Sequence, residues 1–112
     1  MKFVLSATRE VEWPVLIKVP VDGGTFQEHK ITARFRLLND QEQDELIKQH
    51  PNDPDMALLK VAVIGLKGVH DEGGKELPFS ERLLADMLRW TFVRIAFVRA
   101  YNEARLGARA KN

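Results

Sequence analysis

The sequence predicts an α+β fold in which an antiparallel β-hairpin in residues 1–38 packs against about four helices in residues 39–112. Three observations support this fold class. Apolar and polar residues alternate in the first third of the chain, which is the period of a half-buried strand. Asp22-Gly23-Gly24 interrupts the alternation with residues that tolerate positive φ. Beyond Asn39, apolar residues recur at helical spacing.

A hairpin is expected over residues 11–37. The apolar odd positions of its first strand are Val11, Trp13, Val15, Ile17, Val19 and Val21. Pro14 and Pro20 have no N–H to donate, so this strand is expected at a sheet edge or with its bonded side interrupted there. The opening Phe3-Val4-Leu5 is expected to add a short third strand, because an isolated hairpin is marginally stable in water.

Four helices are expected after the hairpin, in residues 40–49, 54–64, 80–88 and 91–106. Asp40 followed by Gln43 is typical of a capping box. Asp53-Pro54 gives the second helix an N-cap followed by a proline that needs no N–H. A polar, glycine-rich loop is expected at residues 65–79, and Ser80 caps the third helix.

One hydrophobic core is expected, because 112 residues are the usual size of a single domain. The chain is therefore predicted to be one domain, residues 1–112. Strand and helix periodicity predict that the core contains Val15, Ile17, Val19, Phe35, Leu59, Val63, Leu84, Leu88 and Ile95.

The composition excludes several classes of protein. Apolar residues make up 45% and charged residues 29%, as in soluble globular proteins. No apolar run approaches the ~20 residues of a membrane-spanning helix, and no export signal is visible, so we expect a cytoplasmic protein without membrane contact. Disulfides and thiolate metal sites are excluded because the chain has no cysteine. The net charge of +1 gives no strong overall field for polyanions.

No residue pattern for catalysis is present. His29, His50 and His70 lie too far apart in the sequence to form a motif of metal-ligand spacing. Asp71-Glu72-Gly73-Gly74 has the composition of a calcium loop but lacks the alternating ligands and the closing glutamate. Neither serine lies in a nucleophile-elbow pattern. We therefore expect no enzyme, no catalytic residues, no cofactor and no metal.

The last predicted helix is the candidate binding element, because its apolar residues face more than one side and one stripe cannot bury them all. Aromatic residues beside arginines are typical anchors of protein interfaces. The partner-binding candidates are Trp90, Phe92, Arg94, Phe97, Arg99 and Tyr101. The simpler interpretation is that the aromatic residues pack the core and the arginines extend into solvent.

Several short motifs follow one another along the chain. They are Val19-Pro20-Val21-Asp22-Gly23-Gly24, Ile64-Gly65-Leu66-Lys67-Gly68-Val69, Asp71-Glu72-Gly73-Gly74, Leu77-Pro78-Phe79-Ser80 and the ending that runs from Ala100-Tyr101 to Lys111-Asn112. Together they resemble the tail assembly chaperones of long-tailed bacteriophages. The sequence departs from that family at Leu66, where many relatives carry tryptophan, and in its arginine-rich last helix.

The resemblance implies a protein of the bacterial host cytoplasm that binds the tape measure protein and keeps it soluble. It also implies help in recruiting tail tube protein and absence from the mature virion. Self-association is expected separately, because the aromatic residues of the last helix cannot all face one core stripe and could meet a copy of the protein. Two alternatives stay open. One is a structural tail or head–tail connector protein. The other is a nucleic-acid-binding module, although we expect no nucleic-acid partner. It would use the arginines Arg89, Arg94, Arg99, Arg105 and Arg109.

Overall fold

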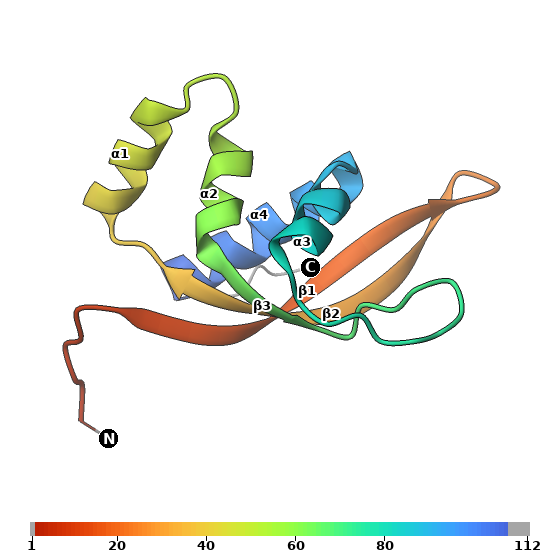
Figure 1. Cartoon of the computed structure of the whole chain (residues 1–112), viewed down its shortest axis with the longest axis horizontal. Helices are drawn as coiled ribbons and strands as arrows, with labels where there is room; N and C mark the ends of the chain where they lie inside the picture. Colours follow the sequence, from red (N-terminus) through yellow and green to blue (C-terminus); the bar gives the residue numbers. More distant parts are fainter. Residues whose placement is uncertain (1, 108–112) are drawn as a thin grey trace.

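Three antiparallel strands form one sheet, and four helices lie over one of its faces (Figure 1). The computed structural model describes residues 2–107. The sheet has the order β1-β2-β3, and its strands are β1 (Arg9–Val21), β2 (Thr25–Leu37) and β3 (Val63–Lys67). The predicted α+β class, with a small antiparallel sheet against four helices, is confirmed.

The hairpin formed by β1 and β2 follows from alternation and from its turn. Its ladder is unbroken from the Arg9–Leu37 pair to the Val21–Thr25 pair. The turn requires two consecutive residues with positive φ, and Gly23 at 91° and Gly24 at 77° supply them. The strand with the two prolines, β1, lies at an edge of the sheet as predicted.

The third strand differs from the prediction. Phe3-Val4-Leu5 is exposed and forms no strand, whereas β3 comes from residues that we expected to end the second helix and begin the following loop. Val63 and Leu66 bury their side chains when they pair with β2. Gly65 lies opposite Arg34, and a Cβ there would come within 3.2 Å of the Arg34 Cβ. The region after residue 38 is therefore not purely helical.

The helices are α1 (Asp40–Gln49), α2 (Pro54–Ala62), α3 (Glu81–Leu88) and α4 (Thr91–Leu106). The predicted bounds of α1 and α4 are confirmed, and Ser80 caps α3 as expected. The capping box of α1 uses Asn39 and Glu42 instead of Asp40 and Gln43. Pro54 occupies the first turn of α2, but the side chain of Asp53 makes no capping bond.

The core lies between the helices and the inner face of the sheet, and α4 packs mainly on β1. Seven of the nine predicted core residues are buried, and Val19 is partly buried. Ile95 was wrongly assigned to the core, because its side chain is 53% exposed. Among the described residues, no helix combines the length and the apolar character needed to span a membrane.

Candidate protein-binding surface

The buried face of α4 contains two of the six predicted binding residues. Phe97 and Tyr101 are almost completely buried, and the Tyr101 ring meets Phe35 edge to face at 5.5 Å between ring centroids. Small residues on the same side, Ala96 and Ala100, let α4 approach the rest of the core closely. The assignment of Phe97 and Tyr101 to a contact surface is therefore corrected, because neither is accessible to a partner.

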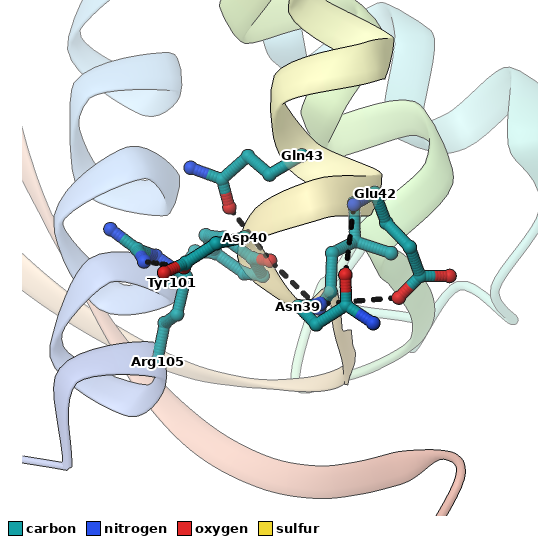
Figure 2. A network of polar contacts seen from close by, with 7 residues as sticks. Asn39, Asp40, Glu42, Gln43, Tyr101 and Arg105 are labelled. Carbon is teal, nitrogen blue, oxygen red and sulfur yellow. Dashed lines mark hydrogen bonds and ion pairs between the residues drawn. The ribbon is translucent and has the colours of Figure 1, made fainter.

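Tyr101 belongs to a polar network that joins α4 to the start of α1 (Figure 2). Its hydroxyl accepts a hydrogen bond from the Leu38 N–H at 3.1 Å and donates one to Gln43 Oε1 at 3.4 Å. Burial raises the pKa of Tyr101, although the bond from Leu38 opposes that shift. One turn further along α4, Arg105 Nη1 lies 3.3 Å from Asp40 Oδ1.

Trp90 lies at the corner between α3 and α4 and is 63% exposed. Its backbone fixes the corner, since its N–H donates to Met87 O and its carbonyl accepts from the N–H groups of Val93 and Arg94. The indole extends from this rigid corner and lies against the half-buried Phe92 with the ring centroids 5.9 Å apart. Trp90 and Phe92 therefore form a fixed, accessible aromatic pair.

The two candidate arginines have different environments. Arg94 is half-buried, and its Nη1 donates to Leu88 O at 3.5 Å, at the end of α3. Arg99 is exposed and makes no ion pair with the described residues. Arg99 is therefore available to an acidic group of a partner, whereas Arg94 also holds the α3–α4 corner.

Sequence reasoning missed a stripe on the side of α4 that faces away from its most buried residues. This stripe, which we name the outer stripe, consists of Ile95, Val98, Asn102 and Leu106. Ile95 and Leu106 are exposed, whereas Asn102 and Val98 are partly buried and Val98 packs against the core. Ile95 is 53% and Leu106 is 69% exposed. Their spacing of three and four residues was visible in the sequence, but apolar residues also occupy the opposite face. Only the docking of α4 on β1 decides which face is accessible.

The remaining motifs do not assemble into a chemical site. The Asp71 carboxylate accepts from the N–H groups of Gly73 and Lys75, so it shapes its own loop. A groove of about 630 Å³ between α2 and α3 is lined mainly by apolar side chains, with Lys60, Glu81 and Arg82 as its charged residues. In residues 2–107, no group of three or more histidine, aspartate or glutamate residues is placed to hold a metal ion.

The arginines of the nucleic-acid alternative do not form one free basic face. Arg89 pairs with Asp86 at 3.8 Å, and Arg105 pairs with Asp40. Arg109 lies outside the described residues, as does the Lys111-Asn112 ending that contributed to the family resemblance.

Comparisons with known proteins give no relative for this chain. No protein-family model matches the sequence, and searches of curated proteins and of solved structures found no significant match. The accessible aromatic pair and the outer stripe of α4 are thus the geometric basis for a functional proposal.

Proposed function

We propose that the chain is a tail assembly chaperone of a long-tailed phage or prophage. It binds the tape measure protein, keeps it soluble while tail tube protein assembles around it, and is absent from the finished particle. The observation that carries the proposal is the set of exposed apolar side chains along α4, namely Trp90 at its N-cap and Ile95 and Leu106 in the outer stripe.

The physical argument starts from the partner. A tape measure protein is long and helical, so before assembly it presents apolar helix faces that would otherwise associate with one another. A rigid helix with an accessible apolar face can cover such a segment by helix-to-helix packing. α4 meets this requirement because its other face is anchored in the core by Phe97 and Tyr101.

Co-expression tests the proposal. The full chain is produced together with the tape measure protein encoded by the same phage or prophage, and the soluble fraction is measured with and without the chain. We expect the tape measure protein to be soluble and to copurify only when the chain is present. A Trp90→Ala chain is expected to retain its fold and to lose most of this effect, because aromatic anchors dominate interfaces.

Two results would contradict the proposal. One is a tape measure protein whose solubility and copurification do not depend on the chain. The other is detection of the chain in purified virions, which would favour a structural tail or connector protein.

Arg99 is the observation that favours the nucleic-acid alternative, since it is exposed and has no acidic partner among the described residues. Steeply salt-dependent binding to duplex DNA would support that alternative.

A further inference from the structure

The outer stripe of α4 has the geometry of a helix-docking face. Ile95, Val98, Asn102 and Leu106 follow one another at intervals of three, four and four residues. At the helical period, they fall within about a quarter of the circumference, directly opposite the buried face. They span three turns, so the stripe matches about three turns of a second helix lying along it.

Cationic groups border the stripe on both sides. Helical spacing places Arg94 and Arg105 along one flank and Arg99 along the other. The one acidic residue of α4 is Glu103, and its Oε1 accepts from the Trp13 indole N–H at 3.4 Å. Arg105 is paired with Asp40 and Arg94 is half-buried, so the positive charge at this border is centred on the exposed Arg99. The three arginines still outnumber Glu103 and Asp40, so the charge of the border favours a partner with carboxylates.

Asn102 interrupts the apolar stripe near its middle. A single polar residue in a helix-packing seam fixes the register of the two helices and lowers the total affinity. Trp90 is the N-cap of α4 and Phe92 lies in its first turn, so their aromatic pair is near the N-terminal end of the stripe. The face therefore has an aromatic end and a polar centre, which distinguishes one alignment of a bound helix from the others.

The outer face of the sheet provides a contrast. It also exposes an apolar side chain, Leu16, but acids and bases alternate around it. Glu10 pairs with Arg34 at 3.2 Å, and Lys67 pairs with Glu12 at 2.9 Å, which lowers the pKa of the Glu12 carboxyl. Because these acids are already paired with neighbouring bases, this face supplies control positions whose apolar residue is surrounded by ion pairs.

We propose that the outer stripe of α4 binds one amphipathic helix of a partner protein, and that aspartate or glutamate residues flank the apolar side of that helix. The inference rests on the proposed function only for the identity of the natural partner, a segment of the tape measure protein. It adds the chemistry of the segment: three turns of helix, an apolar stripe and an acidic border.

Two synthetic helical peptides test the charge preference with the wild-type full chain. Both carry the same leucine stripe over about four turns. One has glutamate and the other has lysine at the flanking positions. Fluorescence anisotropy of the labelled peptides gives each Kd. We expect the glutamate peptide to bind at least about tenfold more tightly at low salt, and we expect added salt to reduce this difference.

Three variants on α4 and two control variants on the sheet locate the binding face. Ile95→Asp and Leu106→Asp alter exposed stripe positions, and each is expected to weaken the glutamate peptide about tenfold or more, because a buried apolar contact is lost. Arg99→Glu is expected to weaken the glutamate peptide about fivefold and to strengthen the lysine peptide. Leu16→Asp and Lys30→Glu make the same chemical changes on the outer face of the sheet, and both should leave the two Kd values unchanged.

Equal affinity for the two peptides would overturn the inference. So would a charge preference that Arg99→Glu does not alter, or a loss in Leu16→Asp as large as that in Ile95→Asp. Binding of labelled duplex DNA that depends on Arg99, without binding of either peptide, would replace the helix by a nucleic acid. The peptide results are independent of the co-expression test. The chain can prefer the glutamate peptide without binding the tape measure protein, and it can bind the tape measure protein without preferring the glutamate peptide.

Discussion

Trp90 and Phe97 are both aromatic and lie seven residues apart, yet they occupy opposite environments. Trp90 extends from the α3–α4 corner into solvent, and Phe97 is completely buried. Phe97→Ala is therefore expected to lower the free energy of unfolding by about 3 to 5 kcal/mol. Trp90→Ala should leave the melting temperature nearly unchanged and weaken partner binding by roughly 1 to 4 kcal/mol. Thermal melts and binding titrations of both variants check this contrast.

Tyr101 offers a direct measurement of burial, because it is the one tyrosine of the chain. Desolvation raises its pKa above the ordinary value of 10.0. The ultraviolet absorbance of tyrosinate should therefore develop at higher pH in the native chain than in the chain unfolded by denaturant.

The same shift predicts how stability depends on alkaline pH. Below pH 10.0 the hydroxyl is protonated in both states, so its contribution is fully present. As the pH rises further, the unfolded chain releases this proton first. The free energy of unfolding therefore falls as the pH rises toward and through the pKa of Tyr101 in the folded chain. Denaturant titrations from neutral to alkaline pH measure the loss, and a Tyr101→Phe chain should lack this component. A native titration no higher than the unfolded one would contradict the prediction.

At the scale of single elements, α1 shows how a cap sets a helix start. The Asn39 side chain accepts from the Glu42 N–H at 2.8 Å, and Glu42 Oε1 accepts from the Asn39 N–H at 3.1 Å. Asn39→Ala is expected to lower the free energy of unfolding by about 1 kcal/mol, measured by denaturant titration. Asp44→Ala in the same helix serves as the control and should change it by less than about 0.5 kcal/mol.

The elements that could be predicted from the sequence are those with strong local signals. Alternation with a glycine turn predicted the hairpin, and the spacing of apolar residues predicted α1 and α4 with their observed bounds. β3 could not be predicted, because a short apolar run such as Val63-Ile64 is equally compatible with a helix end. Its pairing with β2 depends on contacts about 30 residues away in the chain.

The candidate site was predicted less well than the fold. Of the predicted binding residues, Trp90, Phe92 and Arg99 are accessible or partly accessible, whereas Phe97 and Tyr101 belong to the core. Conversely, Ile95 was predicted to be a core residue and is exposed. The reason lies in α4 itself. Its apolar residues surround the helix, so periodicity identifies a helix but not the side that faces the core. The positions of β1 and α3 decide that orientation, and they are tertiary information.

For the whole molecule, the free edge of β1 bears on whether the chain associates with other copies of itself. The ladder to β2 is unbroken past Pro14 and Pro20, which are six residues apart and so have the same orientation. Their missing N–H groups therefore fall on the free edge, where they disfavour pairing with another chain.

Replacing both prolines by valine tests this protection. Pro14→Val with Pro20→Val restores two outward N–H groups, so we expect a concentration-dependent shift toward dimers and larger species in size-exclusion chromatography. Thr32→Val is the control, because it adds similar apolar surface in the central strand without adding an edge donor. A chain that stays as monomeric as the wild type after the double change would show that the prolines do not protect the edge.

The way α1 is attached has a consequence for motion. No residue of α1 is buried, its backbone packs against α2 alone among the described elements, and its link to α4 is the polar network around Tyr101 and Arg105 (Figure 2). A helix held in this way can open while the sheet and α4 stay folded. Hydrogen exchange should therefore be faster at the amides of α1 than at those of β2 and α4. Gln43→Ala should accelerate exchange in α1 and leave β2 unchanged.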